Sequence, residues 1–381
     1  MDIKAGPDCY RIMSFESTSN IRRVLRNSIC REPSPKIATE ISACLRQGRM
    51  FFETAIQSPI EIRPLLIFHG VLGFSKAIIL ARHQRVHEAS PISCGLSDTS
   101  CENVRIENIK LKIEENGIFQ QANDVIAMLE GVNYNQSFNP LFHKIPFDSS
   151  MNIMGKEIKI RDILARIPSL GRYYKTSFKE YPKNKMIILR YMDDRDGLTH
   201  LEITDPEIYN DRVSLKRIVQ KWRLEYPILE KWCLIKAFQA MGVSYLMFGN
   251  INKDDFDEFS EEFLVDRDGI FETKSGAYNL SDKRIDFRTI LPPLTGGLTN
   301  RGEHMIEDYG GAFISEYAFY FMGMFSLSSL VRYRPQIWSH AIKAWVTKEK
   351  HANRALTLIE KFMDLTISEF PDMIIKAMTI S

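Results

Sequence analysis

Two long apolar segments constrain the fold of this chain more than any other feature of its sequence. They are RPLLIFHGVLGFSKAIILAR at residues 63–82 and ISEYAFYFMGMFSLSSLVRY at residues 314–333. Each has about 20 residues, the length of a helix that crosses a bilayer. However, His69 and Lys76 interrupt the first segment, and Glu316 interrupts the second. We therefore interpret both as core helices of a soluble protein that has no membrane partner.

The composition is that of an ordinary globular protein and gives no global positive field. Hydrophobic residues make up 44% and charged residues 26% of the 381 positions, and the net charge is +2. A polyanionic partner would therefore need a local basic patch. The six cysteines form no Cys-x-x-Cys pair, and the N-terminus lacks the apolar run of a signal peptide. These features predict a cytoplasmic protein with no metal and no other cofactor.

Helical periodicity dominates both ends of the chain. Residues 38–83 are typical of a helical hairpin, in which two helices are joined by a short proline-containing turn. Residues 306–334 predict a long helix that ends before Pro335, because proline disfavours helix at the preceding residue. Residues 352–370 predict a last amphipathic helix.

The middle of the chain mixes strands and helices. Residues 104–113 alternate apolar and polar side chains as a strand does, and residues 185–205 predict a β-hairpin around an Asp- and Gly-rich turn. Between them, residues 160–167 predict a helix that stops at Pro168.

These elements predict an α+β fold that is mainly α. An N-terminal helical hairpin or bundle packs with a C-terminal helical region, and a small mixed β insert lies between them. The corresponding regions are residues 1–100 (helical), 101–298 (mixed α/β) and 299–381 (C-terminal helical).

Three stretches together resemble the YaaC-like proteins, a bacterial family. They are RPLLIFHGVLGFSKAIILARH followed by CGLSD, IRDILARIPSL followed by YYKTSF, and FSLSSLVRYRPQIW. Their order and spacing agree over residues 43–370. The resemblance implies a mostly helical protein without established chemistry. Members often have His-Gly-Leu where this chain has Cys94-Gly95-Leu96, which argues against a catalytic role for that position.

The hairpin at residues 38–83 also resembles HEPN bundles, many of which are metal-independent RNases in toxin and anti-phage systems. Their motif is Arg, four to six residues, then His, and Arg82 and His87 match it. The resemblance implies that the arginine neutralises a phosphate, that the histidine transfers protons, and that sites meet across a dimer. The two residues are about 140° apart on an ideal helix, so the helix must end or bend between them.

The same residues also have structural interpretations. Cations in the last turn of a helix stabilise its negative end, and Arg82 and Arg85 suit that role. His83 and His87 have the i, i+4 spacing of a zinc pair, but Gln84 occupies the position where a zincin has glutamate.

Other groupings favour loops or packing over chemistry. Arg332 and Arg334 could bind a nucleic acid beside Tyr333 and Trp338, or could instead lock a helix end. The acidic runs at 193–196 and 252–263, together with His200, are typical of solvated turns. The run from Gly296 to His304 is typical of a plain loop, although a loop before a helix can bind an anion.

The sequence therefore supports two functional hypotheses. The first is an interaction or effector subunit of an anti-phage defence or stress-response complex. It would bind a protein partner or a second copy of itself, and RNA or DNA through Arg85, Arg332 and Arg334. The second is a metal-independent endoribonuclease that acts as a dimer through Arg82 and His87.

Overall fold

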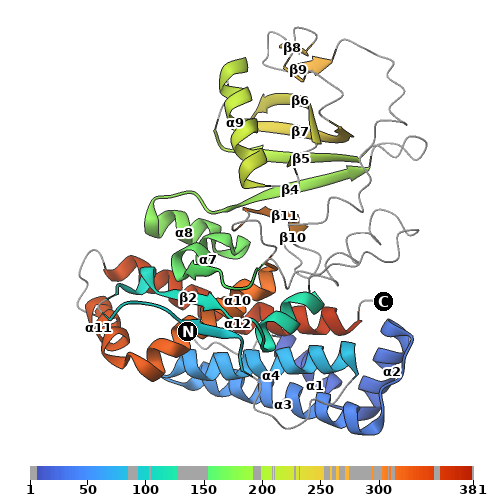
Figure 1. Cartoon of the computed structure of the whole chain (residues 1–381), viewed down its shortest axis with the longest axis vertical. Coiled ribbons are helices and arrows are strands. Elements are labelled where there is room, and N and C mark those ends of the chain that lie inside the picture. The colour runs from blue at the N-terminus through green and yellow to red at the C-terminus, as the bar shows by residue number, and fades with distance from the viewer. Residues whose placement is uncertain are drawn as a thin grey trace. The chain divides into compact units, whose positions relative to one another are not determined.

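The chain forms two compact units, which Figure 1 shows in a computed structural model. The helical unit comprises Met1–Asn133, Pro146–Lys183 and Ile314–Ser381, and the β unit comprises Tyr134–Ile145 and Asn184–Phe313. The structure describes residues 7–84, 93–102, 104–126, 153–191, 199–207, 209, 211–226, 229–230, 232–252, 258–259, 263–265, 271–273, 294–295, 303–307, 309, 314–346 and 352–379.

The N-terminal helices of the helical unit are α1 (Pro7–Phe15), α2 (Thr18–Ile29), α3 (Pro35–Gln57) and α4 (Arg63–His83). Helices α3 and α4 form the predicted hairpin and pack closely, because glycines lie where they cross. A Cβ on Gly73 would come within 3.0 Å of the carbonyl oxygen of Cys44 and of the amide nitrogen of Gly48. The two backbones therefore approach to a distance that a side chain would prevent.

The C-terminal helices complete the same core. They are α10 (Glu316–Tyr333), α11 (Pro335–Val346) and α12 (Ala352–Thr379). Helix α4 packs against α10 and α12 as well as against α3 (Figure 1). Ser315 caps α10, since its hydroxyl accepts a hydrogen bond from the amide of Ala318, and every residue from Glu316 to Leu330 is buried.

A small sheet and two short helices lie against these helices. Strands β1 (Leu96–Asp98), β2 (Lys110–Ile113) and β3 (Glu157–Lys159) pair antiparallel in the order β1-β2-β3. A single turn, η1 (Ile106–Asn108), precedes β2. After β3 come α7 (Ile160–Arg166), the turn η2 (Pro168–Leu170) and α8 (Gly171–Phe178).

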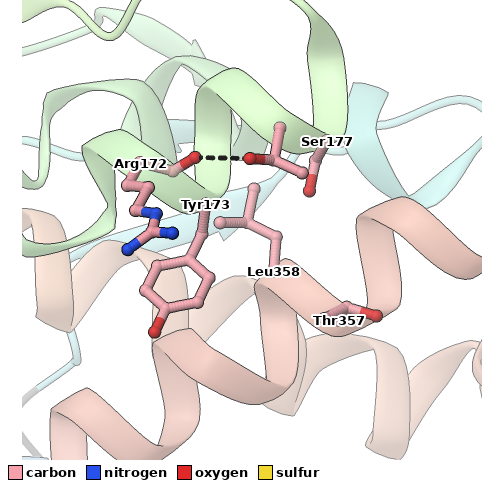
Figure 2. A pocket seen from close by; sticks show the side chains of 6 residues that line it. Arg172, Tyr173, Ser177, Thr357 and Leu358 are labelled. Carbon is pink, nitrogen blue, oxygen red and sulfur yellow. Dashed lines mark hydrogen bonds between the residues drawn. The ribbon is translucent and has the colours of Figure 1, made fainter.

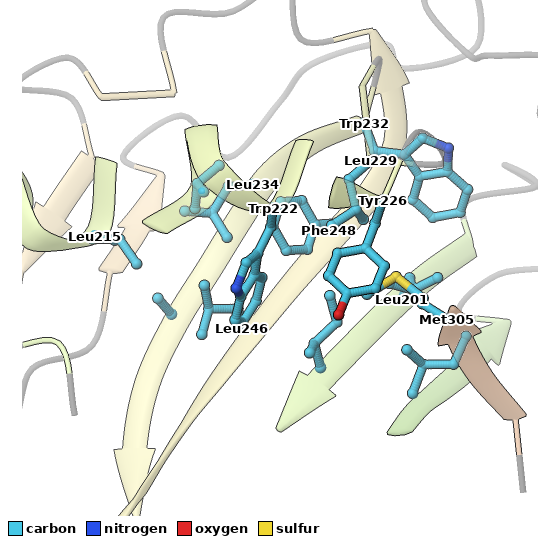
Figure 3. Packing of buried hydrophobic residues seen from close by; sticks show 14 residues of the cluster. Leu201, Leu215, Trp222, Tyr226, Leu229, Trp232, Leu234, Leu246, Phe248 and Met305 are labelled. Atoms are coloured by element: carbon cyan, nitrogen blue, oxygen red, sulfur yellow. The ribbon is translucent and has the colours of Figure 1, made fainter. Parts of the chain in front are cut away.

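The β unit contains an eight-stranded sheet and one described helix. The strand order is β10-β11-β4-β5-β7-β6-β9-β8, and neighbouring strands run antiparallel. The elements are β4 (Asn184–Tyr191), β5 (Thr199–Asp205), α9 (Arg212–Glu225), β6 (Trp232–Ala240), β7 (Val243–Asn252), β8 (Phe263–Val265), β9 (Phe271–Thr273), β10 (Leu294–Thr295) and β11 (Glu303–Ile306). Trp222 of α9 packs with Leu246 and Phe248 of β7 in a single apolar core, which Figure 3 shows.

The predicted fold class, α+β and mainly α, is confirmed, as are the hairpin of α3 and α4 and the β4–β5 hairpin. Two predicted helix limits are wrong. Residues 303–306 form β11 instead of lying in or just before a long helix, and that helix begins at Glu316. Helix α12 continues through Pro371 to Thr379, although proline removes one backbone hydrogen bond.

Candidate functional site

Arg82, the predicted phosphate-binding arginine, joins the ends of two helices. It lies in the last turn of α4, and its Nη2 donates a 2.7 Å hydrogen bond to the carbonyl oxygen of Ala377. That carbonyl belongs to the last turn of α12, where backbone acceptors have no partner within the helix. Burial lowers the pKa of the Arg82 guanidinium to about 10, so the group stays cationic at neutral pH. Arg82 thus stabilises the carboxyl end of α12.

His87, the catalytic partner predicted for Arg82, lies outside the described residues, and so does Arg85, a predicted nucleic-acid contact. Helix α4 ends at His83, and Gln84 follows it in the left-handed backbone conformation, with a φ of 50°. The helix therefore ends between Arg82 and His87, as a shared phosphate site requires.

Arg334 and Arg332 have different environments at the end of α10. The Nη2 atom of Arg334 donates to the carbonyl oxygen of Ser100 at 2.7 Å, and its Nε lies 3.3 Å from the carboxylate of Asp98. These contacts attach the segment that follows β1 to the end of α10. Arg332 is exposed, and its guanidinium carbon lies 4.9 Å from the centroid of the Tyr333 ring, which is 70% exposed.

Two further side chains near Arg332, those of His69 and Cys94, have shifted pKa values. Burial, followed by the charges of Arg332 and Lys76, lowers the pKa of His69, whose ring stacks on Phe51 at 5.3 Å. Burial raises the pKa of the Cys94 thiol, so the thiol is protonated at neutral pH. A protonated thiol is a weak nucleophile, and this agrees with the argument against a catalytic role for Cys94.

The helical unit also contains a cavity of about 330 Å³ that the sequence did not predict (Figure 2). Helix α8 supplies Arg172, Tyr173, Thr176 and Ser177, and α12 supplies Thr357 and Leu358. Helix α8 begins directly after η2, and it buries Tyr174 against the unit. Arg172, Tyr173 and Thr176 are exposed because they lie on the opposite side of this helix.

The described lining of the cavity consists of one cation, one phenol ring, the hydroxyl groups of two threonines and a serine, and a leucine, and it includes no carboxylate. Within the part of the chain that the structure describes, the guanidinium of Arg172 makes no hydrogen bond and no ion pair. The sequence signal was the run GRYYKTSFKEYPK, in which basic and aromatic residues alternate.

Several buried polar groups of the helical unit form hydrogen bonds with one another. The hydroxyl of Tyr320 donates to the Glu369 carboxylate, and Ser169 donates to the same oxygen at 3.1 Å. Tyr317 and Ser75 share a further hydrogen bond between α10 and α4. These bonds connect core helices and open onto no described cavity, so we interpret them as structural.

The described residues include no group of three His, Cys, Asp or Glu side chains that could hold a metal ion. Of the acidic turns considered above, Asp193, Asp194 and Asp196 lie outside the described residues, as do Gly296 and Arg301 of the glycine-containing run. His200 lies in β5. One described helix, α4, is long and apolar enough to cross a membrane, but 72% of its most apolar stretch is buried within the protein.

This fold and these contacts define a mainly helical α+β protein, in which two of the predicted site arginines hold elements of the fold together. The model of the YaaC-like protein family matches residues 13–378, and the chain belongs to that family. The resemblance to the YaaC-like proteins is thus confirmed, whereas the likeness to HEPN bundles and the cytoplasmic location stay predictions. No curated protein and no solved structure matches the chain.

Proposed function

We propose that this YaaC-like protein is an interaction subunit that binds an acidic protein partner through the outer face of α9. The observation that carries the proposal is the composition of that face. Lys216, Arg217 and Lys221 are exposed there together with Val213 and Leu224, which are 79% and 85% exposed. Such a face combines positive charge with large apolar groups that are left in water.

The spacing of the two aliphatic residues places them on one line. Val213 and Leu224 are 11 residues apart, which corresponds to about 20° around an ideal helix. The opposite side of α9 is buried through Leu215, Val219 and Trp222, so the outer residues face solvent. Of the cations there, Lys221 lies 3.5 Å from the Glu225 carboxylate and Lys216 lies 5.6 Å from the centroid of the Phe259 ring. The partner we propose has an apolar patch for each aliphatic residue and carboxylates between these patches.

Charge and geometry favour a protein over the other possible occupants of this face. Two aliphatic side chains find little to pack against on a nucleic acid, and they are too few for the wide apolar face of a membrane-surface helix. A second copy that paired through the same face would place like charges together. The proposed setting, a complex of phage defence or of a stress response, comes from the resemblance to HEPN bundles.

Reversing the charge of α9 is expected to release the partner. Lysine-specific cross-linking in native cells, followed by mass spectrometry, should yield links from Lys216 and Lys221 to one acidic protein. That protein, once purified, should bind the triple variant Lys216→Glu/Arg217→Glu/Lys221→Glu roughly tenfold or more weakly than it binds the wild type. The matched control is Arg31→Glu/Lys36→Glu/Lys76→Glu, which makes the same charge change at exposed residues of the helical unit. Equal binding by both triple variants would refute the proposal.

The ribonuclease hypothesis is the second candidate, and the end of α4 between Arg82 and His87 favours it. Under this hypothesis, purified protein cuts total RNA in the presence of EDTA. His87→Ala should then lower the cutting rate roughly 100-fold, since proton transfer is lost, while the melting temperature stays unchanged. Arg82 is a poor test because it also stabilises α12. His340→Ala, at an exposed position of α11, is the control. If wild type and His87→Ala are equally inert, the isolated protein is not this nuclease.

A further inference from the structure

We infer that the cavity between α8 and α12 binds a nucleotide, with the phosphate on Arg172 and the base against the ring of Tyr173. This inference concerns the helical unit and does not depend on the protein interface proposed for α9. The ligand is either a free nucleotide or one nucleotide of a single strand, because both present the same phosphate, sugar and base.

Arg172 is the charged residue of the cavity lining. Its side chain is exposed at the cavity, and it has no hydrogen-bonding or ion-pair partner among the described residues. A guanidinium group has five N–H donors in a planar fork that matches two phosphate oxygens at once. The only other charged side chains described beside the cavity wall are those on neighbouring turns of α8 and α12.

Those neighbouring charges carry both signs, but none of the described acids pairs with Arg172. Lys175 and Lys179 are exposed on and just after α8, whereas Glu180, the acid that follows α8, forms a 2.6 Å ion pair with Arg161. On α12, Glu360 and Asp364 follow the lining residues Thr357 and Leu358, and the charge of Arg63, which lies 4.0 Å from Asp364, acts on both acids. An anion entering the cavity therefore meets, in Arg172, a guanidinium that no described carboxylate neutralises.

Tyr173 is the aromatic residue of the cavity lining. Tyr173 is 40% exposed, and the ammonium group of Lys361 lies 5.6 Å from the centroid of its ring. An exposed tyrosine ring offers a stacking surface that accepts any nucleobase. The positive group near the ring also favours a ligand that carries both a π-system and a negative charge.

The hydroxyl groups of the cavity lining come from two threonines and a serine. Thr176 donates its hydroxyl proton to the backbone carbonyl of Arg172 at 2.9 Å, a bond that Figure 2 marks. Its oxygen can still accept hydrogen bonds, which suits the hydroxyl groups of a sugar. Thr357 stands on the opposite wall and Leu358 forms a buried floor. A volume of about 330 Å³ lies at the lower end of the range for small-molecule sites and suits one nucleotide.

Binding to the full chain tests the inference directly. We expect titration calorimetry to detect binding of the four ribonucleoside monophosphates or of a 5′-phosphorylated RNA tetranucleotide. Binding by the monophosphates identifies a free nucleotide as the ligand, and binding by the tetranucleotide alone identifies a strand. Arg172→Ala should weaken whichever binds at least tenfold, Arg172→Lys should weaken it less, and Tyr173→Leu should weaken it severalfold without changing the response to inorganic phosphate.

The control variant shows whether the loss of one positive charge is enough to weaken binding, and the melting temperature shows whether each variant is folded. Arg31→Ala removes an exposed guanidinium that makes no described side-chain contact, and it should bind as the wild type does. The backbone carbonyl of Arg31 accepts a hydrogen bond from Gln84, the residue that follows α4. This end of α4 is bonded through Arg82 to the last turn of α12. About 20 residues of α12, or roughly 30 Å of helix, separate that turn from Thr357. Absence of binding by every probe, or equal loss in Arg31→Ala and Arg172→Ala at unchanged melting temperature, would overturn the inference.

Discussion

Replacing Gly70 with valine is expected to lower the free energy of unfolding of the helical unit by about 3 kcal/mol, through overpacking of the α3–α4 crossing. A Cβ at this position would lie 2.3 Å from Cδ1 of Phe52 and 3.0 Å from the backbone oxygen of Gly48. Phe52 has no room to move, because it is fully buried and its ring packs against Phe74 at 5.2 Å and against Phe370 at 6.5 Å. The two helices must therefore separate.

The loss is measurable as a shift of the thermal transition. For a unit of this size, about 3 kcal/mol corresponds to a melting temperature roughly 6–12 °C lower. Gly171→Ala is the control, because a Cβ there meets only Pro182, at the ordinary distance of 3.4 Å. If Gly70→Val has the same melting temperature as Gly171→Ala, α3 and α4 do not approach each other this closely.

The parts of the fold that the sequence predicted are those with local patterns. The apolar segment that became α4 and the turn signals of the β4–β5 hairpin are readable from neighbouring residues alone. The start of α10 was placed too early because residues 306–313 carry no strong helix-breaking signal beyond Gly310 and Gly311. What separates β11 from that helix is the pairing of Glu303–Ile306 with β4, which is a long-range contact.

The candidate sites depend on long-range contacts even more strongly. Arg82 meets Ala377, which is 295 residues away, and no local pattern distinguishes that bond from a phosphate contact. The cavity brings Arg172 and Tyr173 to Thr357, so neither helix alone contains it. Composition could identify the basic and aromatic run of α8, but it could not supply the second wall.

Alkaline pH is expected to unfold the helical unit because two tyrosines are buried in its core. Burial raises the pKa of the phenols of Tyr317 and Tyr320, and for Tyr320 the charges of Glu369 and Glu316 raise it further. In the unfolded chain a tyrosine has a pKa of about 10. Above that pH the unfolded state loses protons that the folded state keeps, so the free energy of unfolding falls as pH rises. Each tyrosine contributes a slope of about 1.4 kcal/mol per pH unit, or together about 4 kcal/mol at pH 11.5.

The slope of unfolding free energy against pH separates this effect from the cost of the substitutions themselves. Tyr320→Phe removes a hydrogen bond to Glu369 and Tyr317→Phe removes one to Ser75, which destabilises the protein at every pH. The double variant should nevertheless lose stability less steeply than the wild type between pH 10 and pH 11.5, in urea titrations followed by circular dichroism. Tyr333→Phe, at a position that is 70% exposed, should keep the wild-type slope. If the double variant and the wild type share one slope, the two phenols ionise as readily in the folded core as in water, and the packing of α10 against α4 and α12 is looser than described.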